Sequence, residues 1–404
     1  MRVFFRVLAL VLALGLCSGA LASGLYAVNA GGVAALVDAD GASVLEGDFQ
    51  TVFEVRPGAL YAAGAPGAYE LYDAAGSRLF GPFEMIDDMG GALIFRRGGL
   101  YGAVDEAGAM LVEPEWTQLT WGGGFLALQG NPLDEQPDEV LALAEGGASP
   151  TGIYTESGLA PFFEGRMVYR AADGRYGCLD GAGNAAIPAE WGCIGDFQDG
   201  AAIVSDGAMY GLIGADGGPL TPVGYVWLQR GADALFGLRE DGVLEALSPD
   251  GSALCRIDAG GGAVSVAGDH AAVGGTLYDL TGAAVFAGSG DALYFPGLDG
   301  QVILSDGPWG SACETLLDPD GRAASKKYQR ILPLTAGRYA FMTFEADMSD
   351  VRCGLLDAAG RELSPAVYNE IIPLGQDRLA LVSDGAVVFA DIDGREIKRI
   401  IRTP

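Results

Sequence analysis

His270 is the only histidine in the chain, so the sequence excludes a histidine-based metal cluster and allows at most one histidine-containing catalytic triad. The Gly-x-Ser-x-Gly motif that exposes a nucleophilic serine is absent from the sequence. The stretch Ala-Gly-Asp-His-Ala-Ala around His270 predicts a solvated turn ahead of a strand. We therefore expect no histidine-dependent enzyme activity.

Three turns contain an Asp-x-Asp-Gly motif whose carboxylates could bind calcium. None of them continues with the further acids and terminal Glu of an EF-type loop. The calcium candidates, for which turn chemistry is the alternative, are Asp38, Asp40, Asp318, Asp320, Asp391 and Asp393. The Gly-rich stretches 122–124 and 260–262 lack the Lys-Ser/Thr of a phosphate loop, so no cofactor is predicted.

Aromatic residues recur at one position, eleven residues after the start of a repeated turn: Trp116, Trp191, Tyr225 and Tyr368. Such rings could stack on sugars if they face outward, and Trp121, Trp227 and Trp309 could join them. Recurrence at one repeat position is also typical of core packing between units. The four registered aromatics are thus ligand-face candidates, with packing as the alternative.

The turn that sets this register is acidic-x-x-Gly, which predicts a hairpin with Gly in the left-handed conformation. It occurs at Asp38–Gly41, Asp73–Gly76, Asp105–Gly108, Asp180–Gly183, Asp279–Gly282, Asp318–Gly321, Asp357–Gly360 and Asp391–Gly394, and without the acid at Gly214–Gly217 and Ser248–Gly251. The long interval after Asp105 predicts a degenerate unit near Thr155–Gly158. Together these turns indicate about eleven units of about 35 residues.

Each unit reads as three short strands. Two apolar runs precede the turn, and a third run carries Pro and then the aromatic residue. Because Pro removes a donor from the strand ladder, the third strand is predicted to be an edge strand or to begin at the Pro. The registered prolines are Pro82, Pro114, Pro188, Pro222 and Pro365. The sequence predicts an all-β tandem repeat array.

The most complete unit runs from Phe163-Glu-Gly through Tyr176-Gly-Cys-Leu-Asp to Ile187-Pro188 and Trp191, and the next unit begins at Phe197. Gly98–Asp105 and Cys353–Asp357 follow the same pattern, whereas the units within 234–300 keep only the turn. These units resemble bacterial WG repeats. The resemblance implies a β-rich, non-catalytic interaction protein without a defined ligand.

Two architectures bury the faces of such units: a β-propeller-like ring, which we favour, and an open β-solenoid. Propellers usually have about four to eight blades, so eleven units predict two rings or shared blades. The insertion Asn131–Glu139 predicts an exposed loop, and it could divide the array into two sub-arrays near 125–160.

The N-terminus has the pattern of a signal peptide spanning residues 1–22. Arg2 and Arg6 precede the apolar run Val7–Leu16, and Ala20-Leu-Ala22 predicts cleavage before Ser23. The repeat array is therefore assigned to residues 23–404, and the protein is expected to be secreted or extracytoplasmic. A cell-surface lipoprotein anchored through Cys17 is the alternative. No other stretch is apolar enough to span a membrane.

The net charge of −29 disfavours nucleic acid and anionic lipid as partners. Removal of the signal leaves five cysteines, an odd number without zinc spacing; we expect packing roles, and a Cys178–Cys193 disulfide is the alternative. The sequence favours an exported, non-catalytic scaffold that binds a protein or a cell-envelope component. The alternative is an extracellular propeller that binds or degrades polysaccharide with paired carboxylates.

Overall fold

The computed structural model describes residues 24–30, 32–45, 47–130, 138–144, 147–155, 158–290, 292–307, 313–344, 350–384 and 386–401. The predicted signal peptide, Cys17, Ser23, Trp309 and most of the Asn131–Glu139 insertion lie outside these residues. The described residues form 39 strands and no helix. No helix long and apolar enough to cross a membrane is found in this part of the chain.

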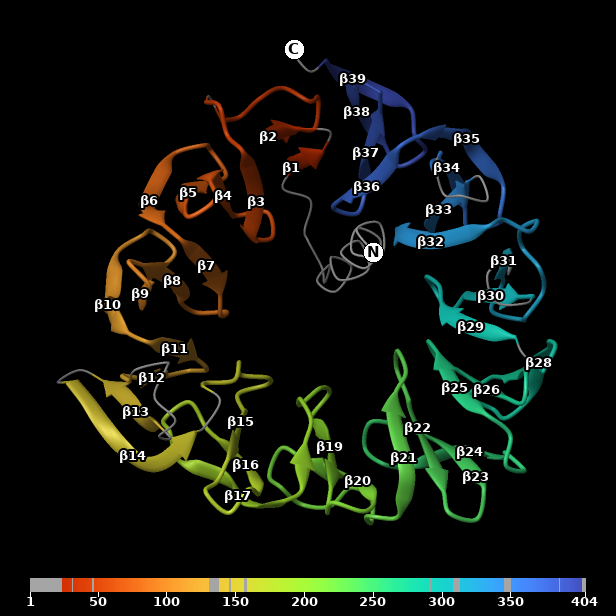
Figure 1. The fold of residues 1–404 in the computed structure, drawn as a ribbon, viewed down its shortest axis with the longest axis horizontal. Helices are drawn as coiled ribbons and strands as arrows, with labels where there is room; N and C mark the ends of the chain where they lie inside the picture. Colours follow the sequence, from red (N-terminus) through yellow and green to blue (C-terminus); the bar gives the residue numbers. More distant parts are fainter. Residues whose placement is uncertain are drawn as a thin grey trace.

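The strands form small antiparallel sheets that follow one another in chain order around a single ring (Figure 1). We number the repeat units 1 to 11. Unit 1 contains β1 (Leu25–Ala30) and β2 (Val33–Asp38), and unit 2 contains β3 (Thr51–Arg56), β4 (Leu60–Ala65), β5 (Ala68–Asp73) and β6 (Arg78–Phe83). Unit 3 contains β7 (Met85–Asp88), β8 (Leu93–Arg97), β9 (Leu100–Val104) and β10 (Met110–Trp116). Unit 4 contains β11 (Gln118–Trp121), β12 (Phe125–Leu128), β13 (Asp138–Ala144) and β14 (Gly147–Thr155).

Unit 5 contains β15 (Met167–Arg170), β16 (Tyr176–Leu179) and β17 (Ala185–Trp191), and unit 6 contains β18 (Cys193–Ile194), β19 (Ala201–Ser205) and β20 (Tyr210–Gly214). Unit 7 contains β21 (Tyr225–Arg230), β22 (Leu235–Arg239), β23 (Val243–Leu247) and β24 (Ala253–Asp258). Unit 8 contains β25 (Val264–Ala267), β26 (His270–Val273), β27 (Thr276–Tyr278) and β28 (Ala284–Ala287). Unit 9 contains β29 (Leu293–Pro296), β30 (Val302–Asp306) and β31 (Cys313–Leu317). Unit 10 contains β32 (Arg330–Thr335), β33 (Arg338–Thr343), β34 (Arg352–Asp357) and β35 (Glu362–Tyr368), and unit 11 contains β36 (Glu370–Leu374), β37 (Arg378–Ser383), β38 (Ala386–Asp391) and β39 (Glu396–Ile401).

Most units have one strand more than the three that the sequence predicts. Within the described residues, seven units have four strands, and the additional strand is the first of the unit and lies nearest the centre of the ring (Figure 1). Innermost strands such as Met85–Asp88 and Gln118–Trp121 are only four residues long. A strand this short has too few alternations for its period to be recognised in the sequence.

The strand that carries the registered Pro is the outermost strand of its unit, as the sequence predicts. Pro82, Pro114, Pro188 and Pro365 lie in β6, β10, β17 and β35, each at the outer edge of its sheet. Pro222 lies between β20 and β21, outside any strand. The missing amide donor therefore falls on an edge that has no neighbouring strand to bond.

The degenerate unit between Asp105 and Asp180 is unit 4, and the predicted location of its turn is wrong. Its hairpin joins β13 to β14 between Ala144 and Gly147. Thr155–Gly158 is not this turn, because Thr155 ends β14 and its hydroxyl donates to the Gly158 carbonyl oxygen at 2.9 Å. The range 125–160 lies mostly within the sheet of this single unit.

Each acidic turn is closed by its own carboxylate and packs against the preceding unit. Asp105 Oδ1 accepts hydrogen bonds from the amides of Ala107 and Ala109, at 2.9 and 2.8 Å. Gly108 then adopts a φ of +82°, and a Cβ there would lie 2.8 Å from the carbonyl oxygen of Leu79 in unit 2. The turn glycines of the neighbouring units also approach the outer segment of the unit before them. The turn is therefore the joint between consecutive units.

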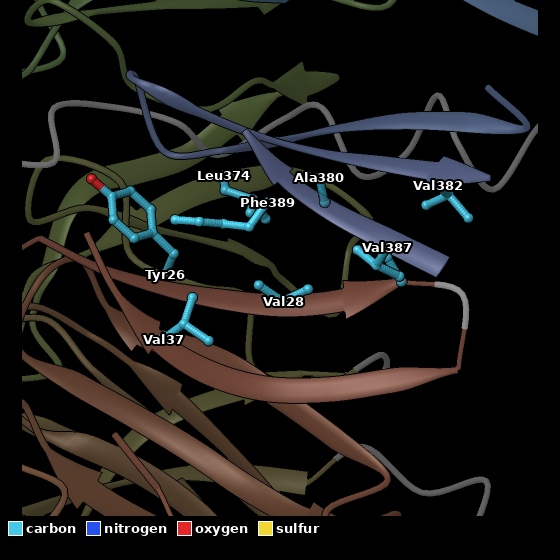
Figure 2. Packing of buried hydrophobic residues seen from close by; sticks show 9 residues of the cluster. Tyr26, Val28, Val37, Leu374, Ala380, Val382, Val387 and Phe389 are labelled. Atoms are coloured by element: carbon cyan, nitrogen blue, oxygen red, sulfur yellow. The ribbon is translucent and has the colours of Figure 1, made fainter. Parts of the chain in front are cut away.

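The same joint closes the ring between unit 11 and unit 1. A Cβ at Gly41 would lie 3.0 Å from Cβ of Lys398 in β39, and the Lys398 ammonium donates to the Gly41 carbonyl oxygen at 2.6 Å. Tyr26 donates a hydrogen bond of 2.9 Å to Asp377. Figure 2 shows the apolar side chains that pack across this closure: Tyr26, Val28 and Val37 from unit 1, and Leu374, Ala380, Val382, Val387 and Phe389 from unit 11.

The fold is thus a propeller-like closed ring rather than an open solenoid. One ring accommodates all eleven units, so the two rings expected from ordinary propellers are not needed. Units 6 and 7 share one seven-stranded sheet, because β20 pairs with β21. The units are small, and each rotates by less relative to its neighbour than the blades of an eight-bladed ring do.

An ion pair joins units 2 and 3 and gives a pH-dependent prediction. Arg56 in β3 binds both carboxylate oxygens of Asp88 in β7, at 2.7 and 2.8 Å, and both side chains are less than one-fifth exposed. The Arg56 guanidinium lowers the pKa of Asp88. The pair therefore stabilises the fold fully above the unfolded pKa of about 3.9, and this contribution is lost as the pH falls through the folded pKa.

Replacing Asp88 by Asn is expected to lower the free energy of unfolding by about 1–3 kcal/mol at pH 7. Urea unfolding between pH 7 and pH 2 should show the difference from the wild type shrinking toward zero below about pH 4. The control is Glu113→Gln on the exposed outer strand β10, which should change stability by less than about 0.5 kcal/mol. A difference for Asp88→Asn that is the same at every pH would contradict the assignment.

Candidate functional site

The registered aromatics belong to the packing between units. Tyr225 is 2% exposed, so its proposed place on a ligand face is wrong, and its hydroxyl donates to Glu245 at 2.8 Å. Trp116, Trp191 and Tyr368 are half-buried against three different core clusters. Trp121 and Trp227 pack in the same way. The repeat places one side chain per unit against its neighbour, which is the packing alternative.

His270 is buried, contrary to the solvated turn that the sequence predicts. It is the first residue of β26 and is 7% exposed, and its Nδ1 atom has no hydrogen-bond partner among the described residues. Burial raises the pKa of Asp279, but hydrogen bonds from Thr281 and Ala283 and the charge of His270 outweigh it, so the net pKa is lowered. The polar sequence before His270 indicated a turn, and the hairpin places His270 just after that turn.

The carboxylates of the Asp-x-Asp-Gly turns are engaged in turn chemistry. Asp38 Oδ1 accepts hydrogen bonds from the amides of Asp40 and Ala42, at 3.0 and 2.8 Å. Asp391 makes the same pair of bonds to Asp393 and Arg395, and Asp318 bonds the amide of Arg322. Asp320 pairs with Arg322 at 2.5 Å. Across the described ranges, no three His, Cys, Asp or Glu side chains are grouped so that they could hold a metal ion.

The cysteines of the array carry free thiols at Cys178, Cys193, Cys255 and Cys353, so the alternative Cys178–Cys193 disulfide is not present. Burial raises the pKa of Cys178 and of Cys353 to about 11. Both residues lie in the core, where the thiol packs as a small apolar group.

Two buried glutamates were not recognised in the sequence. Glu245 is 2% exposed and binds Arg239 and Arg256, each at 2.9 Å, in addition to Tyr225. Glu314 is equally buried; its carboxylate accepts a hydrogen bond from the Ile331 amide and lies 3.1 Å from Arg330. Burial raises the pKa of Glu314. The two carboxylates belong to units 7 and 9 and each has its own partners, so they are structural and not a catalytic pair.

A depression of about 580 Å³ lies between units 10 and 11, at the turns that join their strands. Its lining is formed by Arg338, Asp357, Ala358, Ala359, Arg361, Leu363, Asp393, Gly394 and Arg395. Arg338 comes from the start of β33, whereas Arg361 and Arg395 directly follow the glycines of two neighbouring turns. The repeat thus brings three guanidinium groups of two units to one opening.

Ion pairs order this depression. Arg338 reaches from unit 10 to Asp393 in unit 11, with Nη2 at 2.8 Å from the carboxylate. Arg361 binds Asp357 through Nε and Nη2, at 2.7 and 2.5 Å. The side chains of Arg361 and Arg395 are nevertheless 78% and 79% exposed. The depression therefore offers both guanidinium donors and carboxylate acceptors to a ligand.

The sequence carries a signal for these arginines that is separate from the motifs considered above. In the last three turns the residue after the turn glycine is an arginine, namely Arg322, Arg361 or Arg395. A comparison of this position across the repeats would have singled them out. Arg338 shows no such pattern, because only the packing of unit 10 against unit 11 brings it to the same opening.

The sequence matches no protein-family model and no curated protein. Among solved structures, the computationally designed Ika8 protein is 13% identical, with a TM-score of 0.32 over 69% of this chain and 93% of that chain. BamB from Moraxella catarrhalis is 16% identical, with a TM-score of 0.28 over 63% of this chain and 88% of that chain. KlHsv2 with loop 6CD replaced by a Gly-Ser linker is 8% identical, with a TM-score of 0.27 over 71% and 96%. Similarity at this level assigns no function.

Proposed function

We propose that this protein is an exported, non-catalytic scaffold built from WG-like repeats, which binds a protein partner at the turns of its C-terminal units. The observation that carries the proposal is the depression between units 10 and 11. It is lined by Arg338, Arg361, Arg395, Asp357 and Asp393, and it opens at the joint between two neighbouring sheets.

A binding role fits the chemistry of this depression better than catalysis does. Its two lining carboxylates are each held by an arginine, Asp357 by Arg361 and Asp393 by Arg338. Arg361 and backbone amides lower the pKa of Asp357, and these interactions outweigh the opposing effect of its burial. A general acid needs a pKa near the working pH, so a carboxylate held ionised in this way is suited to accept hydrogen bonds.

Export supplies the setting in which such a scaffold would work. The predicted signal peptide would deliver residues 23–404 to the cell envelope or the medium. Mass spectrometry of the protein recovered from its producing cell is expected to give Ser23 as the first residue. An acylated N-terminal Cys17 would support the lipoprotein alternative, and an intact Met1 would overturn export.

The test of the scaffold function is retention of a defined partner. The purified chain would be mixed with a solubilised envelope fraction of the producing cell, and the mixture would be separated by size. A protein that co-elutes with the chain would then be produced in pure form and titrated against it. The proposal expects saturable binding of the pure partner and no release of reducing sugars from a polysaccharide panel. Sugar release would establish the polysaccharide enzyme instead, and elution of the chain alone in every fraction would overturn the scaffold.

A further inference from the structure

The position four residues after the start of the turn is arginine only in the last three units. The other units with a recognised turn have Ala42, Ser77, Ala109, Asn184, Gly218, Ser252 and Ala283 there. The amides of Arg322, Arg361 and Arg395 each donate to the carboxylate that begins their turn, at 2.8, 2.9 and 2.8 Å. Three neighbouring units therefore present an arginine at the same position of the same turn.

The charge of the chain is distributed unevenly along the sequence. Residues 313–404 contain 12 of the 24 Lys and Arg residues but only 14 of the 53 Asp and Glu residues. Their net charge is −2, whereas residues 1–312 account for −27 of the total of −29. The negative charge of residues 1–312 repels an acidic partner, whereas the nearly balanced charge of the C-terminal units repels such a partner much less.

The arginines at the depression retain capacity for a ligand. Arg395 lies 3.9 Å from its nearest carboxylate oxygens, beyond hydrogen-bond distance. Arg361 uses its Nε and Nη2 atoms for Asp357. A guanidinium has five N–H donors in a planar fork, so Arg361 keeps donors that suit a second carboxylate. Arg338 also lines the depression, and its Nε atom is buried and has no hydrogen-bond partner among the described residues.

The lining favours a peptide over other anions. Among the residues that line the depression there is no aromatic ring on which a sugar could stack. Asp357 and Asp393 would repel a polymer that carries only negative charge, but they can accept hydrogen bonds from the amides of a peptide. An acidic peptide supplies both the carboxylates for Arg361 and Arg395 and the N–H groups for the aspartates.

We propose that the depression between units 10 and 11 binds an acidic peptide segment of the partner, with side-chain carboxylates paired to Arg361 and Arg395. This inference rests on the proposed scaffold function and names the chemistry of its binding site. Arg322 in unit 9 extends the row, so a longer acidic segment would continue from unit 11 toward unit 9. The interaction is electrostatic and weakens as salt rises.

The test uses the full protein and a fluorescein-labelled octaglutamate probe, with binding followed by fluorescence anisotropy at low and at physiological salt. Replacement of both Arg361 and Arg395 by Gln is expected to weaken binding at least tenfold. The matched control replaces Arg170 and Arg175, two exposed arginines of unit 5, by Gln and should change binding less than twofold. Equal loss in the two double variants, or no measurable binding to the wild type, would overturn the proposal.

Three further measurements separate the alternatives. Octaglutamine should not bind, and tighter binding of oligogalacturonate or polyphosphate than of octaglutamate would replace the peptide by a polyanion. Circular dichroism and urea unfolding of both double variants are compared with the wild type, so that a loss of folding is not mistaken for a loss of binding. Arg361→Lys and Arg395→Lys are milder changes that keep the charge, and they should restore part of the binding. If the partner identified from the envelope binds the R361Q/R395Q variant as tightly as the wild type, the peptide site is wrong while the scaffold function stands.

Discussion

Replacement of Phe389 by Ala is expected to lower the free energy of unfolding by about 3–5 kcal/mol and to open the ring. Phe389 is fully buried between units 11 and 1, where its ring centroid lies 5.4 Å from that of Tyr26. Every other pair of neighbouring units is joined by the chain itself, but these two are held by side-chain packing and a few polar contacts. Loss of this large aromatic side chain from the closure therefore acts on the one joint without a covalent connection.

The matched control is Phe236→Ala. Phe236 is also fully buried, and its cluster lies in units 7 and 8. Urea unfolding should show a comparable loss for the two variants, whereas small-angle X-ray scattering should show a larger radius of gyration only for Phe389→Ala. If Phe389→Ala loses stability but keeps the radius of gyration of the wild type, the remaining contacts between units 11 and 1 are sufficient to keep the ring closed.

Replacement of Gly108 by Ala is expected to destabilise the protein by about 3–5 kcal/mol, through two effects that can be separated. The first is the φ of +82°, which disfavours any residue with a Cβ. The second is the approach of the new Cβ to within 2.8 Å of the carbonyl oxygen of Leu79, which would force units 2 and 3 apart.

Gly67 isolates the first effect, because its φ is +83° and nothing lies within 4 Å of its ideal Cβ position. Gly67→Ala should therefore cost only about 1–2 kcal/mol. Chemical denaturation of both variants measures the difference, which we assign to the joint between units. Equal losses for the two variants would show that backbone conformation, and not the close approach, makes glycine necessary in the acidic turn.

These expectations share one feature of the molecule. The expected losses of stability and the proposed binding site both lie at joints between units, where a turn of one sheet meets the outer segment of the sheet before it. The joint between units 10 and 11 combines this packing with the arginines of two turns.

The sequence by itself determined the repeat, its hairpins and its outer edge. The acidic residue and the glycine of each turn act within five consecutive residues, so local spacing is sufficient to place most of them, as the bonds of Asp105 to Ala107 and Ala109 show. The registered prolines mark an edge strand for an equally local reason, since the missing amide is a property of the residue itself. The net charge likewise follows from composition alone.

Tertiary structure decided what depends on neighbouring units. The closure of the ring brings Tyr26 against Phe389, which are separated by almost the whole array, and no pattern in the sequence pairs them. Burial of Tyr225 and His270 depends on which sheet covers each strand, and the depression exists because Arg338 of one unit meets Asp393 of the next. Periodicity specifies a unit, whereas these contacts arise only when eleven such units pack around one axis and close.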